Sequence, residues 1–356
     1  MANNKRLGKA KTGKNDEFYT QLSDIENELR HYKAHFQGKT VLCNCDDPRV
    51  SNFTKYFILN FRALGLKKLI TTCYKNQDID LFSTNSCEKA VYMVYTGTEN
   101  SNSIPTPEEI GVKELKGDGD FRSAECIELL KEADIVVTNP PFSLFREYVA
   151  QLIKYDKKFI IIGHINALKY LEVFPLLQNN IIWCGYGFNI SMVFKTPYEN
   201  TLEANRKYVL SKGYNPDDNF LKTPAIAWYT NLDIQKRHED IVLFKSYNPI
   251  DYPTYENFNA IDVAKVSDIP FDYDGIMGVP ITFMGNYNPE QFEILGNCCD
   301  TAYLREVGFK PVGQKAISML RAQGNKAHVT ANMPTPYVIR NGIVELPYAR
   351  ILIKRK

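Results

Sequence analysis

The sequence predicts an α/β fold built around a doubly wound, mostly parallel sheet, and two observations support this prediction. Short apolar, β-branched segments alternate with helical patterns from residue 39 to residue 185, which is typical of strands covered on both faces. Unusual polar and glycine-containing loops follow Cys45, Thr72, Asp120 and Thr138. Such sheets bind ligands outside the carboxyl ends of their strands, so these loops are the first candidates for a site.

Six segments have the composition of buried strands, and a seventh is expected to close the same sheet. They are residues 40–45, 68–74, 90–95, 133–139, 158–163 and 181–185, followed by 225–230. Helical periodicity lies between them. Phe145, Tyr148 and Leu152 share one helical face, as do Phe53 and Phe57. Strand–helix repetition of this kind predicts a doubly wound sheet.

The organisation changes in the last third of the chain. Beyond residue 245 the sequence is rich in Pro, Asn, Asp and aromatic residues. Asn341 followed by Gly342 predicts a hairpin with a type I′ turn. We therefore expect a second, smaller and irregular α+β domain. The expected parts are a flexible basic arm at 1–14, the sheet domain at 15–245 and the second domain at 246–356.

Positive charge is unevenly distributed. The formal net charge of the 356 residues is only +2, but two stretches are strongly basic. Their cations are Lys5, Arg6, Lys9, Lys11 and Lys14 near the N-terminus, and Arg305, Lys310, Lys315, Arg321 and Lys326 further on. Basic stretches around a near-neutral body are typical of a protein that binds a polyanion. A solvated tail and one exposed helix are the alternative interpretation.

The eight cysteines form no Cys-x-x-Cys pair and no zinc-type spacing with histidine, so we expect no metal. The basic N-terminus lacks the apolar segment of a signal peptide. No apolar run is long enough to span a membrane. We therefore expect a protein of the reducing cytoplasm with no membrane partner.

One motif points to a reaction. Asn-Pro-Pro-Phe at residues 139–142 follows a buried-type strand and precedes an amphipathic helix. An aromatic amine is a poor nucleophile because its lone pair is delocalised. Acceptors on its two N–H bonds, the Asn139 side-chain oxygen and the Pro140 carbonyl, would point that lone pair at a methyl donor. Pro141 adds rigidity without a competing N–H, and Phe142 would stack on an extruded base. The alternative is a strand-ending turn with a buried Phe.

The donor, S-adenosylmethionine, needs a site of its own. In Gly-Asp-Gly-Asp-Phe at residues 117–121, the glycines allow close approach to a planar ligand. Asp118, Asp120 and Phe121 are the expected contacts with the adenine part of the donor. A surface turn or a weak Mg²⁺ loop is the alternative interpretation.

Two other segments are candidates for the methionine part of the donor. Asp46 and Asp47 end the first strand, where a carboxylate could accept from an ammonium group. Capping of the next helix by Asp47 is the competing interpretation. The rings of Phe18 and Tyr19 could flank a sulfonium, and Thr20 could hold a carboxylate. Simple packing at a helix start is the alternative there.

Three further features are interpreted as structural. The segment 38–40 lacks the upstream glycine of a phosphate-binding loop, and Gly185 and Gly187 lack the third glycine of a dinucleotide motif. His164 follows the fifth strand and has no partner in sequence.

Taken together, these segments resemble the EcoRI-type adenine-specific DNA methyltransferases. The resemblance rests on residues 16–21, 43–53, 117–122, 134–145, 228–233, 277–283, 288–292 and 349–354. It implies the Rossmann-like fold of class I S-adenosylmethionine-dependent methyltransferases. One departure is that Asn-Cys-Asp-Asp-Pro at residues 44–48 replaces the glycine-rich loop usual after the first strand.

The resemblance also implies an activity: site-specific methylation of adenine N6 in double-stranded DNA, with base flipping, in a restriction–modification role. It implies a monomer of bacterial or phage origin. Residues 139–142 match the amino-group motif of the family, while residues 18–20 and 120–121 match cofactor-holding segments. The alternatives are an RNA guanine-N2 or protein glutamine methyltransferase with the same motif, and a non-enzymatic DNA-binding protein. The intact motif argues against the last of these.

Overall fold

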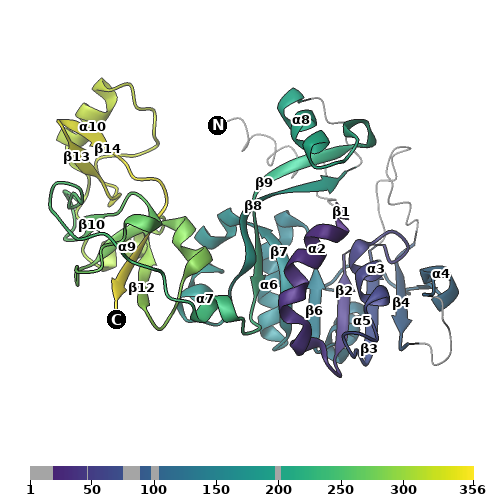
Figure 1. Cartoon of the computed structure of the whole chain (residues 1–356). Coiled ribbons are helices and arrows are strands. Elements are labelled where there is room, and N and C mark those ends of the chain that lie inside the picture. The colour runs from purple at the N-terminus through teal and green to yellow at the C-terminus, as the bar shows by residue number, and fades with distance from the viewer. Residues whose placement is uncertain (1–18, 46, 75–88, 98–103, 197–201) are drawn as a thin grey trace. The chain divides into compact units, whose positions relative to one another are not determined.

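The computed structural model describes residues 19–45, 47–74, 89–97, 104–196 and 202–356. The chain forms two compact units (Figure 1). The first contains residues 1–167 and 183–232, and the second contains 168–182 and 233–356. The division therefore falls about a dozen residues before the boundary expected near 245, and the segment 168–182 belongs to the second unit.

A sheet of nine described strands forms the centre of the first unit, in the order β1-β8-β9-β7-β6-β2-β3-β4-β5. The strands are β1 (Tyr19–Thr20), β2 (Thr40–Asn44), β3 (Lys68–Cys73), β4 (Val91–Tyr95), β5 (Lys113–Glu114), β6 (Ile135–Thr138), β7 (Lys158–His164), β8 (Trp183–Lys195) and β9 (Phe220–Thr230). All seven predicted strands are present, as β2, β3, β4 and β6 to β9.

The direction of the strands corrects one expectation. Strands β2, β3, β6 and β7 are parallel, whereas β4 runs antiparallel to β3 and β9 runs antiparallel to β7. The sheet is therefore mixed rather than mostly parallel. A strand buried on both faces reads as apolar whichever way it runs, so its composition carries no information about direction.

The first unit contains six described α-helices. They are α2 (Leu22–Leu29), α3 (Asn52–Leu59), α4 (Pro107–Ile110), α5 (Ala124–Glu132), α6 (Phe145–Lys154) and α8 (Glu203–Ser211). In Figure 1, α2 lies in front of the strands and α6 lies behind them. Two helices begin at serine caps: Ser51 accepts from Thr54 N at α3, and Ser123 accepts from Cys126 N at α5.

The strand order creates a topological switch point. Strand β2 lies between β3 and β6, and the chain leaves β2 towards β3 and returns later to β6 on the other side. Right-handed crossovers then place α3 and α6 on opposite faces. Loops at the carboxyl ends of β2 and β6 diverge at such a point, which is where open α/β sheets bind ligands.

The second unit has its own sheet, in the order β10-β11-β15-β12. Its strands are β10 (Ile261–Asp262), β11 (Met277–Pro280), β12 (Phe292–Asn297) and β15 (Arg350–Arg355), with helices α7 (Phe174–Gln178), α9 (Thr301–Glu306) and α10 (Gly313–Ala322). A separate hairpin joins β13 (Val338–Arg340) to β14 (Ile343–Glu345). Positive φ angles of 51° at Asn341 and 77° at Gly342 confirm the predicted type I′ turn.

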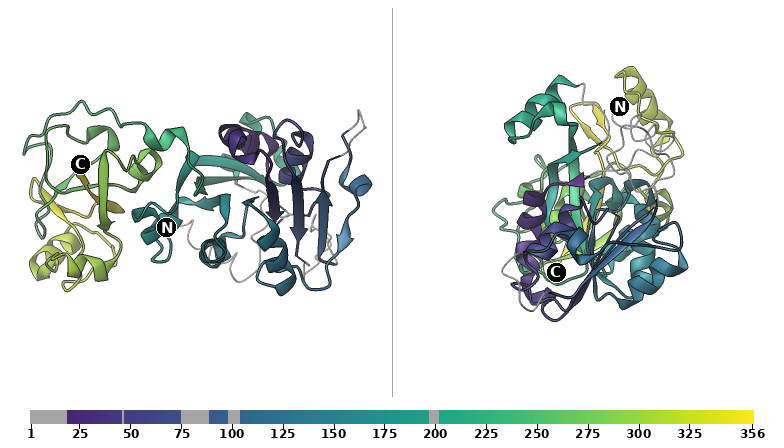
Figure 2. Two further views of the ribbon diagram at one scale, coloured as in Figure 1. Left: turned by 90° about the horizontal axis from the view of Figure 1, so that it is seen from below. Right: turned by 90° about the vertical axis from the view of Figure 1, so that its right-hand side faces the viewer.

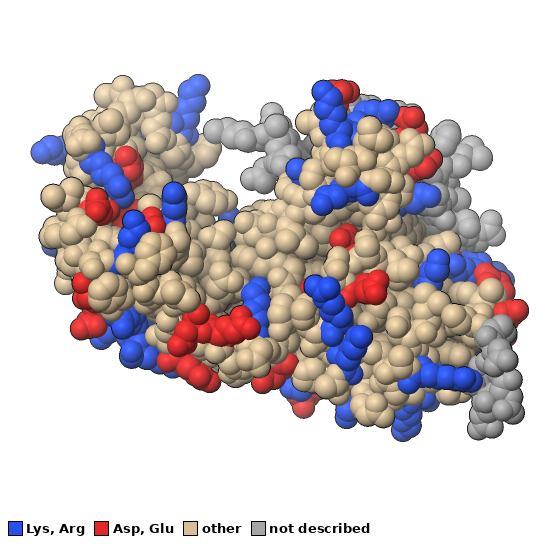
Figure 3. Space-filling view, in the orientation of Figure 1, with Lys and Arg blue, Asp and Glu red and all other residues tan. Residues whose placement is uncertain are grey.

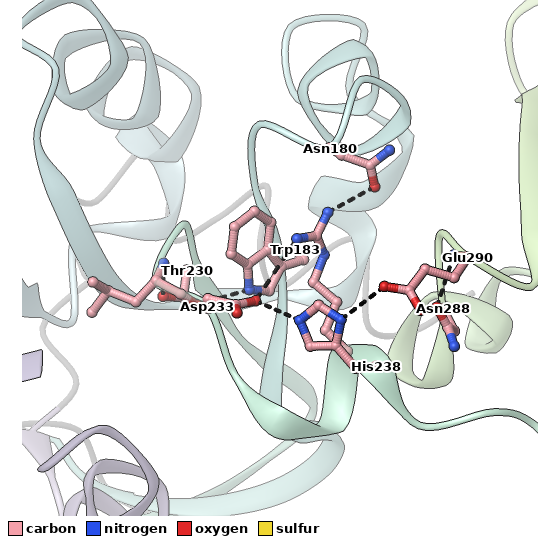
Figure 4. A network of polar contacts seen from close by, with 9 residues as sticks. Asn180, Trp183, Thr230, Asp233, His238, Asn288 and Glu290 are labelled. Atoms are coloured by element: carbon pink, nitrogen blue, oxygen red, sulfur yellow. Dashed lines mark hydrogen bonds and ion pairs between the residues drawn. The ribbon is translucent and has the colours of Figure 1, made fainter. Parts of the chain in front are cut away.

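A polar network ties together the start of this second unit (Figure 4). The ring nitrogens of His238 lie 2.9 Å from Asp233 Oδ1 and 3.2 Å from Glu290 Oε1. Arg237 donates to Asn180 Oδ1 at 3.1 Å. The two carboxylates favour the protonated imidazole and raise the pKa of His238. The network therefore joins the segment after residue 232 to the loop around residue 180 and the turn before β12.

Short 3₁₀ helices complete both units. They are η1 (Arg30–Phe36), η2 (Phe142–Leu144), η3 (Ile165–Lys169), η4 (Pro216–Asp218), η5 (Gln235–His238), η6 (Val266–Asp268) and η7 (Ile281–Asn286).

Candidate active site

The Asn-Pro-Pro-Phe motif lies at the switch point, directly after β6. Thr138 closes that strand, and its hydroxyl donates to the carbonyl of Asn44, the last residue of β2, at 3.3 Å. Tyr148, from α6, donates its hydroxyl to the side-chain oxygen of the same Asn44. Asn139 itself is buried, with 7% of its surface exposed. Hydrogen bonds thus connect the carboxyl ends of β6 and β2 and the first turn of α6 at the point where the motif begins.

The two proline carbonyls differ in their hydrogen bonding. The carbonyl of Pro141 accepts from Leu144 N at 3.0 Å, which closes the turn into η2. Among the residues that the structure describes, none donates to the carbonyl of Pro140. The backbone nitrogens of Pro140 and Pro141 carry no hydrogen, so they do not compete as donors. Of the two carbonyls, that of Pro140 is therefore the one without a donor among the described residues, and Phe142 is half-buried.

The loop at residues 117–121 passes across the end of β3. Gly119 has a φ of +76°, and a Cβ there would lie 2.7 Å from the Cys73 carbonyl oxygen. Only glycine fits this combination of a left-handed backbone and close approach. Glu125 fixes the start of the loop, because its carboxylate accepts from Gly117 N at 3.1 Å. The loop thereby comes to the same sheet edge as residues 139–142.

Within this loop, the carboxylate of Asp120 is held by Arg122. Its Oδ1 accepts from Arg122 Nε at 2.9 Å, and its Oδ2 accepts from Nη2 at 2.7 Å. These hydrogen bonds lower the pKa of Asp120. Arg122 also binds Glu147 of α6 at 2.7 Å. Asp120 is therefore ionised at neutral pH and already shares its oxygens, whereas Asp118 is exposed and caps only Asp120 N, at 3.1 Å.

An aromatic pair links the loop to the motif. Phe121 packs edge-on against Tyr148, with ring centroids 5.1 Å apart. Because Tyr148 also binds Asn44, one side chain connects the 117–121 loop, the end of β2 and helix α6. The sequence predicts Tyr148 only as part of an apolar helical face. The signal for its second role is a hydroxyl-bearing residue in that face, together with an Asn inside an apolar strand.

Asp47 also lies at this edge, and Asp46 lies outside the described residues. Asp47 is 3% exposed, and its carboxylate accepts from Arg49 Nη2 at 2.7 Å and Nε at 2.9 Å. The interpretation of Asp47 as the cap of α3 is wrong, since Ser51 caps that helix. Asp47 instead organises the turn before it, where its carbonyl accepts from Ser51 N at 2.8 Å.

Strand β1 brings Tyr19 and Thr20 beside α3, while Phe18 lies outside the described residues. Thr20 pairs with Phe194 of β8, and its carbonyl accepts from Asn52 Nδ2 at 2.8 Å. Its hydroxyl is buried and has no hydrogen-bond partner among the described residues. The same holds for the hydroxyl of Thr54, in the first turn of α3. Buried polar groups are normally satisfied, so these two hydroxyls fit a polar ligand such as the carboxylate of S-adenosylmethionine.

His164, Gly185 and Gly187, which are interpreted as structural from the sequence, make contacts within the fold. His164 Nδ1 accepts from Asn166 N at 3.0 Å. Gly185 makes room for Glu28, whose Oε1 would lie 2.2 Å from a Cβ there. Glu28 is buried and accepts from Gly187 N at 2.7 Å and from the Tyr32 hydroxyl at 2.8 Å. A buried carboxylate with these donors holds α2 against β8 rather than binding a ligand.

The expected DNA-contacting cations lie in two places. The five from Lys5 to Lys14 fall outside the described residues. Lys315 and Lys326 are exposed in and after α10 of the second unit. Arg321 has a local role, because its guanidinium donates to the carbonyls of Asn325 at 2.7 Å and Ala327 at 2.9 Å.

Among the described residues, no three or more His, Cys, Asp or Glu side chains gather as metal ligands. None of the described helices has the length and apolarity needed to cross a membrane.

Known proteins identify the family. A family model described as the adenine-specific methyltransferase EcoRI matches residues 6–356. The type II methyltransferase M.EcoRI of Escherichia coli is 50% identical over 83% of this chain and 89% of that protein. M.MgeORF184P of Mycoplasma genitalium and M.MpnI of Mycoplasma pneumoniae, also type II methyltransferases, are each 38% identical over 83% of this chain and 87% and 86% of their own lengths. No solved structure matches. The chain belongs to the EcoRI family of adenine-specific methyltransferases and is an adenine methyltransferase of the restriction–modification type.

Proposed function

We propose that the enzyme methylates N6 of an adenine flipped out of double-stranded DNA, and that residues 139–142 carry the reaction. One observation supports this most directly: the motif lies at the switch point, with Asn139 buried and the Pro140 carbonyl receiving no hydrogen bond from a described residue. When bound, S-adenosylmethionine supplies an electrophilic methyl group on a cationic sulfur.

The residues of the motif prepare the amino group. Asn139 Oδ1 and the Pro140 carbonyl each accept one N–H of the adenine amine, so the nitrogen lone pair turns out of the ring plane. Phe142 stacks on the extruded base, a contact worth about 1–3 kcal/mol. The methylated nitrogen is cationic and gives up its proton to solvent without a dedicated base. Rigid placement of the acceptors by Thr138, Asn44 and Tyr148 supplies the orientation.

Residues around the motif are proposed to hold the cofactor. Thr20 donates to the carboxylate of its methionine part, and Asp46 and Asp47 attract the ammonium group. Phe18 and Tyr19 flank the sulfonium. The loop at 117–121 encloses the adenosine, with Phe121 beside the ring. Asp118 then accepts from the adenine amino group more readily than Asp120, which Arg122 already holds.

The second unit is proposed to recognise the DNA sequence, and the N-terminal arm to add affinity through phosphate contacts. Lys315, Arg321 and Lys326 are the candidate contacts in the second unit, and Lys5, Arg6, Lys9, Lys11 and Lys14 those in the arm. We propose a monomer that acts in the bacterial or phage-infected cytoplasm. The family relationship favours DNA over RNA guanine or protein glutamine as the methyl acceptor.

The test replaces Asn139 by alanine. Methyl transfer from labelled S-adenosylmethionine to duplex DNA should be lost, while DNA binding measured by fluorescence anisotropy stays within about twofold. Asn166→Ala, which alters an Asn at the same sheet edge, serves as the matched control. Transfer that survives in Asn139→Ala contradicts the role of this residue. Label that enters only RNA or protein from mixed pools contradicts the proposed acceptor.

A further inference from the structure

One part of the first unit projects beyond the sheet. Ile226 of β9 pairs with His164, the last residue of β7, so the residues of β9 before Ile226 extend past the carboxyl end of β7. Strand β8 accompanies them, because Lys195 pairs with Phe220 at the far end of the hairpin. Helix α8 lies between the two strands in sequence. We call residues 190–195 and 202–225 the hairpin arm.

The hairpin arm leaves the sheet on the side of the active site. Strands β6 and β7 are parallel, so their carboxyl ends share one edge, and this is the edge that carries Asn139. Positive φ angles of 52° at Asn189 and 60° at Ala225 mark the bends where the hairpin departs. Figure 1 and the right-hand view of Figure 2 show α8 beyond the ends of the strands.

Two of the five described cations of the hairpin arm have carboxylate partners. Arg206 binds Asp217 at 2.6 Å, and Lys207 binds Glu203 at 3.5 Å. The remaining three are Lys195, Lys212 and Lys222. Among the described residues, none of these three forms a hydrogen bond or ion pair with a carboxylate. Figure 3 shows Lys and Arg side chains over α8 and the neighbouring strand ends, with Asp and Glu side chains among them.

The ring of Tyr208 holds two of these ammonium groups. Lys222 Nζ lies 4.1 Å from the ring centroid, and Lys212 Nζ lies 5.6 Å from it. The Tyr208 hydroxyl donates to the carbonyl of Ser191 at 3.2 Å, which fixes the ring on the hairpin. An aromatic face attracts cations but leaves their charge unneutralised. Lys212 also lies close enough to Asp24 to lower the pKa of that carboxyl.

We propose that the hairpin arm binds the sugar–phosphate backbone of the DNA substrate, with Lys195, Lys212 and Lys222 as the phosphate contacts. This inference rests on the proposed DNA substrate and adds a surface to it. Ammonium groups that lie on the same ring repel one another, and a bound anion relieves this repulsion. The phosphates of DNA form a regular row of anions, so several lysines can each contact a different phosphate. Lysine contacts a phosphate as a point charge, so these contacts position the duplex without reading its sequence.

The test compares two triple variants with the same change in charge. In the first, Lys195, Lys212 and Lys222 are replaced by glutamine. In the control, Lys33, Lys39 and Lys67 are replaced by glutamine. Lys39 and Lys67 are exposed residues that precede β2 and β3, at the opposite edge of the sheet, and Lys33 is exposed in η1. Dissociation constants for a mixed-sequence duplex are measured by fluorescence anisotropy over a series of salt concentrations.

Each lost phosphate contact lowers the slope of log K against log salt by about 0.9. The hairpin-arm variant should therefore lose about 2–3 from this slope and bind on the order of a hundredfold more weakly at low salt. The control should keep the wild-type slope. At saturating DNA the methylation rate of the hairpin-arm variant should approach that of the wild type, since no residue of the motif has changed. Tyr208→Leu keeps all three charges and should show a smaller loss of affinity.

The outcomes separate this inference from the proposed function. If the wild type methylates duplex DNA but the hairpin-arm variant retains its salt slope, the hairpin arm is not a phosphate contact and the proposed function stands. If both triple variants lose the slope equally, the effect is one of net charge and the inference fails. If the slope changes with single-stranded RNA but not with duplex DNA, the partner is wrong. If the wild type methylates no DNA, the proposed function itself is contradicted.

Discussion

Replacing Tyr148 by phenylalanine tests whether the link between α6 and β2 positions the motif. Tyr148 is fully buried, and its hydroxyl donates to the side-chain oxygen of Asn44. Phenylalanine keeps the ring that packs on Phe121 but removes this donor. Because Tyr148 is 0% exposed, the change takes away a buried donor from the side-chain oxygen of Asn44. An unsatisfied buried acceptor costs about 1–3 kcal/mol of unfolding free energy.

The expected loss of stability is measurable. At roughly 2–4 °C per kcal/mol for a unit of this size, the midpoint of thermal unfolding should fall by several degrees. The rate of methyl transfer at saturating substrates should fall as well, by about tenfold or more, because Asn44 also accepts from Thr138 directly before the motif. The dissociation constant for DNA should change little, because no surface charge is altered.

The control is Tyr155→Phe, at the end of the same helix. The Tyr155 hydroxyl has no hydrogen-bond partner among the described residues, so this change should leave both stability and rate near wild type. A Tyr148→Phe enzyme with wild-type stability would show that the hydroxyl is replaceable. A variant that loses stability but keeps its maximal rate would limit the role of Tyr148 to folding.

Three further changes have expected outcomes. Thr20→Val removes a buried hydroxyl without a described partner. It should leave the unfolding midpoint unchanged or higher and weaken S-adenosylmethionine binding about five- to hundredfold by calorimetry, and tighter or equal binding contradicts the cofactor assignment. Asp24 has a pKa raised to about 6, mainly by burial, so its carboxylate costs stability above that pH and not below pH 4. Asp24→Asn should therefore stabilise the protein at pH 8, by about 1 kcal/mol after allowance for solvent screening, and hardly at pH 4. The raised pKa of His238 stabilises the fold below about pH 6.5 and loses this effect as the pH rises through the folded-state pKa. His238→Gln should lower the unfolding midpoint at pH 6 more than at pH 9, and equal losses at both values would refute the role of charge.

The strands and the hairpin turn were predictable for different reasons. Buried strands are apolar, so composition alone located the segments that became β2, β3, β6 and β7. The hairpin at Asn341 was predictable because its turn requires positive φ at two consecutive residues. The composition of a strand does not indicate which way it runs, so the antiparallel orientation of β4 and β9 was not predicted. Residues 233–245 form little regular structure, so the sequence shows no change of periodicity there from which to read the end of the first unit.

The features of the candidate site also fall into those that the sequence can indicate and those that it cannot. Residues 139–142 could be proposed from the sequence because the chemistry proposed for them depends on a contiguous stretch of chain. Interactions between residues distant in sequence could not be: Tyr148 and Asn44 are 104 residues apart, and either alone looks like ordinary packing. The binding of Asp120 by Arg122 is local, yet it could not be predicted because an acidic residue near an arginine is common on any surface.

The lysines of the hairpin arm show the limit of reading charge along the sequence. Lys195 and Lys222 are separated by 27 positions and stand among acidic residues, so no window of the sequence is strongly basic there. In the folded arm, two of the acids, Glu203 and Asp217, pair with neighbouring cations. The ring of Tyr208 then collects lysines that sequence spacing would scatter. Folding leaves the net charge of the segment unchanged, but it gathers Lys212 and Lys222 on one ring, and an aromatic contact leaves their charge available to an anion.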